Sequence, residues 1–290
     1  MTLEINPLHK LFGAEIIGAD LTQSLDDAIF AEIRDAFETY SVIVLRGPVI
    51  TDEQQIALSD RFGEIQVAFK ANQTGGSMFS RQSNIDFETG DIFPPDHPRL
   101  TYLKTNMMWH SDSSYMAPET LCSMLSAREI PPVGGNTEFV STRIAWDQLP
   151  DEMKTRIEGL TVIHDLSYAR DKMDKTILTD EQRAAAPPVK HPLIQVNPAN
   201  GRKSMLIGAH AAFIDGWSEA DSRALLDDLV ERASPPENIY SHAWQEGDVL
   251  VWDNRCVLHR ATTFDSSRYR RHLERTTINV RPADRSERTA

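Results

Sequence analysis

Short apolar runs alternate with segments of helical spacing in the first part of the chain. The apolar runs predict strands at residues 14–17 and 41–45. Helical spacing predicts one helix over residues 26–40 and a second that begins at the capping-box sequence 51–54 and ends at Gly63. Strands and helices are therefore expected to alternate in this region.

Between residues 67 and 108 the periodicity disappears, and glycine and proline interrupt a long polar segment. So long an irregular segment in a folded domain is usually either a functional lid or disordered, and we predict a lid. The rest of the chain has no repeat, no low-complexity tract and no linker. We therefore expect one domain that spans residues 1–290.

Short β-rich runs dominate from residue 120 onward, with two helical stretches between them. The predicted strands are residues 121–127, 136–140, 160–165, 204–207, 248–252 and 275–280, and the predicted helices are residues 142–159 and 218–232. Many short strands of this kind indicate a mainly β fold, a sandwich or barrel with flanking helices on its outside.

Composition narrows the class of partner and the compartment. The net charge of -13 argues against a nucleic-acid partner, because such binding requires cationic side chains that neutralise phosphates. No basic segment precedes an apolar run, and no apolar run is long enough to cross a membrane, so we expect a cytoplasmic protein without a membrane partner. Cys122 and Cys256 lie in apolar runs, which predicts two buried thiols.

The candidate chemistry begins at His110 and Asp112, because residues two apart in an extended segment project from the same face. A histidine and an acidic residue two positions apart are a weak signal alone. Chance gives roughly one such pair in a chain of this composition, and two occur, the second at His272 and Glu274. A facial triad needs a third ligand from a distant strand. His259 supplies one for the first pair, in an apolar run that we expect to end in a turn, and no histidine follows His272.

Arginine residues follow His259 at positions 268, 270, 271 and 275. A guanidinium group binds a carboxylate with two parallel hydrogen bonds, which suits the distal carboxylate of a 2-oxo diacid whose other end chelates a metal. Taken singly, a histidine beside an apolar run is more often a core residue, and an arginine cluster is more often a solvated surface. Their order and spacing together favour the functional interpretation.

Several long blocks of the chain resemble one known family. The sequence is similar to the Fe(II)/2-oxoglutarate dioxygenases of the taurine dioxygenase superfamily, and within it to the 2,4-dichlorophenoxyacetate dioxygenases. The resemblance covers nearly the whole chain, through residues 6–9, 18–21, 109–114, 123–127, 134–139, 207–211 and 252–260.

This resemblance implies a double-stranded β-helix, the cupin-like jelly roll, and Fe(II), 2-oxoglutarate and O2 as cofactor and co-substrates. It implies that His110, Asp112 and His259 hold the iron, and that Thr137 and Arg271 hold the distal carboxylate of 2-oxoglutarate. Arg275 would contact the co-substrate or an acidic group of the substrate. Arg270 is the alternative to Arg271, but Arg271 aligns without a gap. Relatives form oligomers, so a homo-oligomer is expected.

The expected substrate is a small anionic organic acid, a phenoxyalkanoate whose hydroxylation beside the ether oxygen gives a hemiacetal that splits. The residues expected on the substrate side are Asn106, Lys70, Lys104 and His210. The polar segment before His110 differs from that of the relatives, so a sulfonate such as taurine, or an amino-acid-derived or secondary-metabolite substrate, remains an alternative. Two further alternatives are a non-catalytic cupin-like binding protein and a zinc hydrolase, since two histidines and a carboxylate also bind Zn(II).

Overall fold

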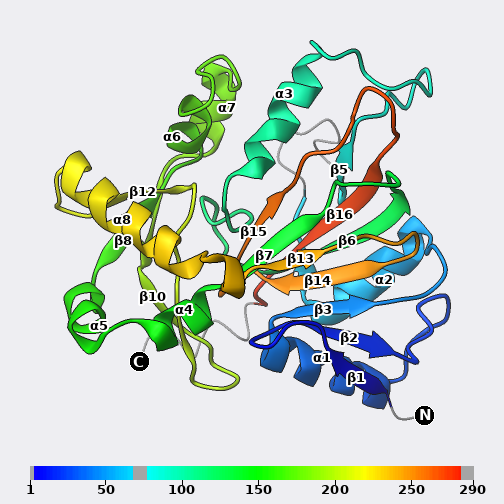
Figure 1. Cartoon of the computed structure of the whole chain (residues 1–290), viewed down its shortest axis with the longest axis horizontal. Coiled ribbons are helices and arrows are strands. Elements are labelled where there is room, and N and C mark those ends of the chain that lie inside the picture. The colour runs from blue at the N-terminus through cyan, green and yellow to red at the C-terminus, as the bar shows by residue number, and fades with distance from the viewer. Residues whose placement is uncertain (1–2, 68–76, 282–290) are drawn as a thin grey trace.

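A large β-sheet forms the centre of the molecule in the computed structural model, which describes residues 3–67 and 77–281 (Figure 1). Its strands follow the order β1 (Glu4–Pro7), β2 (Ala14–Ile17), β3 (Val42–Leu45), β14 (Val249–Asp253), β6 (Thr120–Glu129), β16 (His272–Asn279) and β4 (Glu64–Ile65), and β5 (Ser80–Ser83) also pairs with β16. Only β2 and β3 are parallel among these pairs.

Two helices cover one face of this sheet, α1 (Asp27–Tyr40) and α2 (Asp52–Phe62). Both were predicted, and the capping box of α2 is confirmed by hydrogen bonds in both directions between Thr51 and Gln54. Side chains of a strand alternate between faces, so Met124 of β6 packs toward the helices while Leu125 faces the other way.

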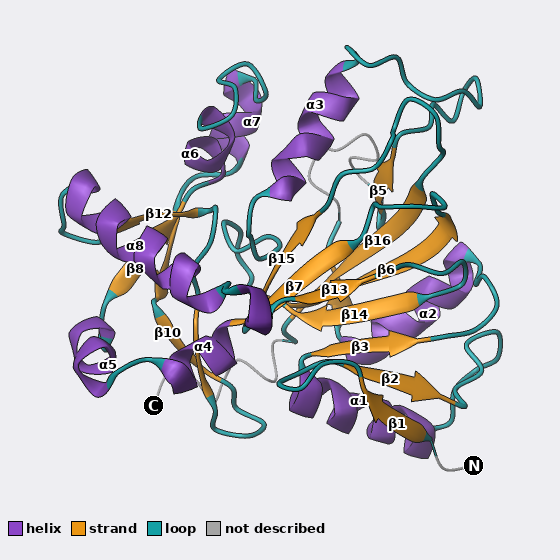
Figure 2. Ribbon diagram, in the orientation of Figure 1, coloured by secondary structure: helices purple, strands orange, loops and turns teal. Residues whose placement is uncertain are grey.

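A small second sheet packs over the free face of the large one (Figure 2). It consists of β13 (Tyr240–His242), β7 (Thr137–Ser141) and β15 (Val257–Ala261). Phe139 and Val257 of this sheet form one apolar cluster with Leu125, Leu250 and Trp252 of the large sheet. Burial of these side chains fixes the spacing between the two sheets, because apolar interiors are densely packed.

A third region lies beside these two sheets and has its own apolar cluster. It contains β8 (Thr161–His164), β9 (Val189–Pro192), β10 (Ile194–Val196), β11 (Lys203–Met205), β12 (Ala211–Ile214), α4 (Thr142–Gln148), α5 (Asp151–Ile157), α6 (Leu166–Asp171), α7 (Asp180–Ala185), α8 (Glu219–Ala233) and a 3-10 helix, η2 (Pro236–Asn238).

Two sequence predictions need correction. The single helix predicted over residues 142–159 is two helices, because Pro150 lacks an amide hydrogen and separates α4 from α5. The segment predicted as irregular contains β5, α3 (Pro98–Lys104) and a 3-10 helix, η1 (Thr105–Met107), within its described part.

The architecture is a mixed α/β fold with several sheets, so helices contribute more than a mainly β fold implies. Both cysteines are buried and unpaired, as predicted. Among the helices of the described residues, none is long and apolar enough to cross a membrane. The lid and the single domain stay predictions.

Gly208 provides a test of how the third region supports the segment around His110. Its φ is +109°, and a Cβ there would lie 3.0 Å from the carbonyl oxygen of Trp109 and 3.3 Å from Cα of His110. We expect Gly208→Ala to lower the free energy of unfolding by about 1–3 kcal/mol, measured by urea denaturation, because a side chain at positive φ is strained and this one also meets backbone.

Gly201 is the matched control, since its φ is +70° but no atom lies within 4 Å of the position of its Cβ. Gly201→Ala isolates the cost of backbone strain. Equal destabilisation by the two substitutions would show that the contact with the His110 segment contributes nothing.

Candidate metal and co-substrate site

Backbone hydrogen bonds place two histidines side by side. The backbone amide of His110 donates to the carbonyl of His259 at 3.1 Å, and the backbone amide of His259 donates to the carbonyl of His110 at 2.9 Å. The two residues thus form an antiparallel pair. Directly opposed residues of such a pair project from the same face. The ring centroids are 4.2 Å apart. His259 lies within β15, and the turn lies before that strand instead of after His259 as predicted.

Asp112 completes a buried cluster with these two histidines. Its carboxylate oxygens lie 3.9 Å from Nε2 of His110 and 3.6 Å from Nε2 of His259. One ligand atom from each residue lies within 4.8 Å of the others. The sequence pattern therefore predicted this convergence of three distant side chains correctly.

The protonation states of the three side chains suit a divalent cation. Burial lowers the pKa of both His110 and His259, so both imidazoles are neutral at pH 7. Burial is the largest single influence on the pKa of Asp112 and would raise it, but the ion pair with Arg275, the two histidines and the hydrogen bond from Ser123 together hold that pKa well below its usual range. Two neutral imidazoles and one carboxylate are the donors of a facial triad, and the donor set fits Fe(II).

Hydrogen bonds orient the ligand atoms. Nδ1 of His110 donates to the carbonyl of Met108 at 2.8 Å, which leaves Nε2 free to accept a cation. Ser123 donates to Oδ2 of Asp112 at 2.7 Å, and the side chain of Asn254 accepts from the Asp112 amide at 3.2 Å. Asn254 also donates to Ser123 at 3.0 Å. Sequence reasoning missed Ser123 and Asn254, since nothing in a single sequence identifies a residue that acts through another.

A cavity extends from His259 to a buried arginine. Thr137, at the start of β7, and Arg271, just before β16, both line it. Arg271 donates from Nη2 to the carbonyl of Gly135 at 3.2 Å, while its buried Nε has no hydrogen-bond partner. Burial lowers the pKa of Arg271 to about 10. Within the described residues no carboxylate lies within 4.0 Å of this guanidinium, so a largely buried cation lines the cavity without a counter-ion.

The neighbouring arginine has a different environment. Arg270 is exposed and forms an ion pair with Glu129 at 2.7 Å. Of the two adjacent arginines, only Arg271 lines the cavity. Arg275 also lines it, although its guanidinium is already paired with Asp112.

A larger cavity of about 330 Å³ adjoins the first and shares Gln82, Asn106, Ala261 and Arg271 with it. Its walls come from the segment before His110 and from the loop between β15 and β16. Lys104 lies on its rim, and Asn106 donates to the side chain of Gln82 at 2.8 Å.

The remaining residues predicted on the substrate side are placed differently. His210 is buried, donates from Nδ1 to the carbonyl of Ser111 at 3.2 Å, and its ring meets that of His110 edge to face with centroids 6.0 Å apart. Lys70 lies outside the described residues.

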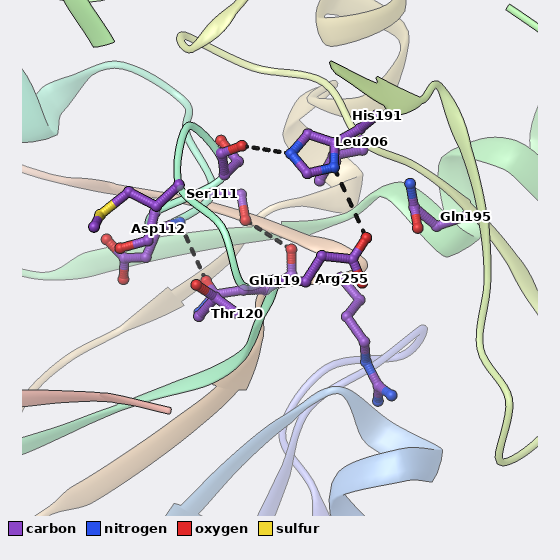
Figure 3. A pocket seen from close by; sticks show the side chains of 12 residues that line it. Ser111, Asp112, Glu119, Thr120, His191, Gln195, Leu206 and Arg255 are labelled. Carbon is purple, nitrogen blue, oxygen red and sulfur yellow. Dashed lines mark hydrogen bonds and ion pairs between the residues drawn. The ribbon is translucent and has the colours of Figure 1, made fainter. Parts of the chain in front are cut away.

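A third cavity, also small, borders Asp112 (Figure 3). His191 donates to the carbonyl of Ser114 at 2.9 Å on its wall, and its other ring nitrogen lies 3.8 Å from Glu119. The volume of this cavity is about 30 Å³.

The serine at position 123 allows a matched test of ligand orientation. We expect Ser123→Ala and Asn254→Ala to weaken Mn(II) binding roughly 10- to 100-fold in a metal titration, because each removes a hydrogen bond that orients Asp112. Ser126 is the control, since it is equally buried on the same strand but bonds to Gln55 on the helix-covered face. If Ser126→Ala weakened metal binding as much, loss of general stability would explain the effect.

Comparison with known proteins identifies the family. The model of the family described as "Taurine catabolism dioxygenase TauD, TfdA family" matches residues 4–277. The alpha-ketoglutarate-dependent 2,4-dichlorophenoxyacetate dioxygenase of Cupriavidus pinatubonensis is 39% identical over 282 residues, which cover 96% of this chain and 98% of that protein. The (S)-phenoxypropionate/alpha-ketoglutarate-dioxygenase of Sphingobium herbicidovorans is 37% identical and covers 92% of each chain.

A solved structure agrees with these relatives. The crystal structure of AAD-2 in complex with Mn(II) and N-oxalylglycine matches with a TM-score of 0.88 and 35% identity, over 96% of this chain and 97% of that one. An enzyme of this family is neither a zinc hydrolase nor a non-catalytic binding protein, so both alternatives are set aside. The match along almost the whole chain and the cluster of His110, Asp112 and His259 show that this protein belongs to the TauD/TfdA family of 2-oxoglutarate-dependent dioxygenases.

Proposed function

We propose that this enzyme hydroxylates a small anionic organic acid of the phenoxyalkanoate type, with Fe(II), 2-oxoglutarate and O2, and releases succinate and CO2. One observation carries the proposal: His259 of the buried triad and Arg271, a largely buried arginine without a counter-ion, line the same cavity. A dicarboxylate that chelates the metal at one end would supply that counter-ion at the other.

His110, Asp112 and His259 would hold the iron, and their grouping on one side leaves other positions for ligands. When bound, the iron would couple oxidation of a substrate C–H bond by O2 to the oxidative decarboxylation of 2-oxoglutarate. The chain's own contribution is to hold both reactants in the correct orientation. Burial of all three ligands also excludes water from the reacting atoms.

Thr137 and Arg271 would bind the distal carboxylate of 2-oxoglutarate. The hydroxyl oxygen of Thr137 already accepts a hydrogen bond from Trp244 at 3.0 Å, so its own hydrogen is available to donate. The guanidinium of Arg271 provides a charge-assisted donor beside it. Arg275 would keep its ion pair with Asp112 and so modify the charge of that metal ligand.

The phenoxyalkanoate class is supported by the names of relatives at 37–39% identity, which act on 2,4-dichlorophenoxyacetate and (S)-phenoxypropionate. Hydroxylation of the carbon beside the ether oxygen of a phenoxyacetate would give a hemiacetal, which splits into a phenol and glyoxylate. The two facing sheets support the predicted jelly roll, and the placement of residues 77–107 along the larger cavity supports a lid. Asn106 and Lys104 belong to this segment, line that cavity and would contact a substrate.

Arg271 and Arg270 form a natural test pair for the co-substrate site. We expect Arg271→Gln to weaken 2-oxoglutarate binding at least roughly 10-fold, because a hydrogen bond to a charged group contributes about 1.5–3 kcal/mol. Arg270→Gln should leave the affinity unchanged, since Arg270 bonds to Glu129 outside the cavity. The measurement is calorimetric titration of 2-oxoglutarate into the Mn(II) protein, and the opposite ranking would refute the assignment.

The reaction is tested by product analysis. The wild type, incubated with Fe(II), 2-oxoglutarate and O2, should form succinate in the presence of a phenoxyacetate and release a phenol. His110→Ala and Asp112→Ala should each abolish this substrate-dependent succinate, because two ligands do not retain the metal. Sulfite release from taurine, or hydroxylation of an amino-acid derivative without phenol release, would instead establish one of the alternative substrates.

A further inference from the structure

Arg170 of α6 is a buried cation close to the triad that neither the metal site nor the co-substrate site uses. Its side chain belongs to a residue that is only 6% exposed, and its Nε is buried without a hydrogen-bond partner. No carboxylate of residues 3–67 or 77–281 lies within 4.0 Å of it. Burying a charge without a partner is costly, so such a group is commonly completed by a ligand.

Contacts of α6 place Arg170 on the side of the triad occupied by His210. The amide of Asp165, the N-cap of α6, donates to the carbonyl of His210 at 2.8 Å. The ring of His210 meets that of His110 at 6.0 Å and that of Tyr115 at 4.7 Å. Tyr115 in turn packs against the apolar cluster that includes Leu166 of α6.

A second helix, α3, also contacts Arg170. The guanidinium carbon lies 5.1 Å from the ring centroid of Tyr102, on α3. Figure 1 shows α3 and α6 as neighbouring helices on the same side of the molecule. The contact between Arg170 and Tyr102 therefore joins α6 to α3, the helix that leads toward His110.

Electrostatics agree with this placement. Burial is the largest cause that lowers the pKa of His210, and the positive charge of Arg170 is the next. The charge of Arg170 also contributes, after burial and Arg275, to the lowered pKa of His110. Because Coulomb interactions weaken with distance and with solvent, both effects require the guanidinium to lie near these rings.

Among the described residues, the other buried arginines except Arg271 have side-chain or carbonyl partners. Arg143 and Arg255 lie 3.6 Å and 2.8 Å from Asp253, Arg275 pairs with Asp112, and Arg99 donates to the carbonyl of Arg81. Arg271 lacks an acidic partner too, but it lines the cavity assigned to 2-oxoglutarate. Arg170 is thus the unpaired buried cation on the His210 side of the triad.

We propose that Arg170 binds the acidic group of the substrate, a carboxylate or sulfonate, and that Tyr102 and Tyr115 contact its apolar or aromatic body. Burial raises the pKa of Tyr115 to about 12, so its hydroxyl stays protonated and can donate a hydrogen bond to the same anion. This inference rests on the proposed function, because it names the residue that selects acids at that site. His210, which was predicted to bind substrate, would then position Tyr115 and α6.

A binding experiment tests the assignment without turnover. The protein loaded with Mn(II) and 2-oxoglutarate is titrated by calorimetry with phenoxyacetate, benzenesulfonate and the neutral phenoxyacetamide. We expect Arg170→Gln to weaken phenoxyacetate binding about 10- to 100-fold while phenoxyacetamide binding is unchanged. Arg170→Lys keeps the positive charge but loses the planar guanidinium that forms two parallel hydrogen bonds, so the loss of phenoxyacetate affinity should be smaller.

The 2-oxoglutarate affinity of each variant, measured in the same protein, reports that the fold and the metal site are intact. Arg183→Gln on α7 is the matched control, because that guanidinium already pairs with Asp171 at 2.7 Å and should not affect any of the three probes. An unchanged ratio of acid to amide affinity in Arg170→Gln overturns the inference. A wild type that binds none of the acids overturns it as well.

Failure of the proposed reaction gives a different result. A wild type that binds phenoxyacetate in an Arg170-dependent manner, yet forms neither phenol nor succinate from any acid, supports Arg170 as the anion site and refutes the phenoxyalkanoate reaction. A wild type that hydroxylates phenoxyacetate, with Arg170→Gln equally active at limiting substrate, supports the reaction and overturns the role of Arg170.

Discussion

The reciprocal backbone pairing of His110 with His259 is the constraint on which the site depends. Two hydrogen bonds hold a loop residue opposite a strand residue, so their imidazoles project from one face and their separation is fixed by backbone geometry. Asp112 follows two residues later and is held by Ser123 of the large sheet. The site is therefore assembled where the small sheet packs over the large one, and the apolar cluster between the sheets maintains the distance between ligands.

Buried charge distinguishes structural groups from groups that need a ligand. The turn between β14 and β15 is surrounded by a satisfied network, in which Arg255 pairs with Asp253 and with Glu38 of α1. That network fixes the turn that carries Asn254, and so supports Asp112 indirectly. Arg170 is buried and Arg271 is largely so, but neither has an acidic partner among the residues described. Breaking or omitting one member of a buried ion pair is costly, which gives these two side chains a reason to bind anions.

The sequence predicted the triad, the two N-terminal helices and most long strands, because each has a local signal. The capping box at Thr51, the apolar run of β14 and the spacing of His110 and Asp112 are all visible in one chain. The strand β5, Ser80–Ser83, was missed because its side chains are polar and its conformation comes from pairing with β16. The division of residues 142–159 into two helices also has a local signal, Pro150.

Other features depend on tertiary contacts and could not be predicted. Ser123 and Asn254 act only through Asp112, and the burial of Arg170 depends on α3, which is distant in sequence. The preference for Arg271 over Arg270 came from the family resemblance, and the different environments of the two side chains are visible only in the structure. Lys70 falls outside the described residues, so its expected role stays a prediction.

The most direct measurement of the central claim is an anaerobic titration of the Fe(II)-loaded protein with 2-oxoglutarate, followed by visible absorption. Chelation of the metal by the 2-oxo acid gives a metal-to-ligand charge-transfer band, and we expect this band to appear and saturate in the wild type. A protein that binds one Fe(II) yet shows no such band at saturating 2-oxoglutarate would contradict the arrangement of triad, cavity and buried arginine described above.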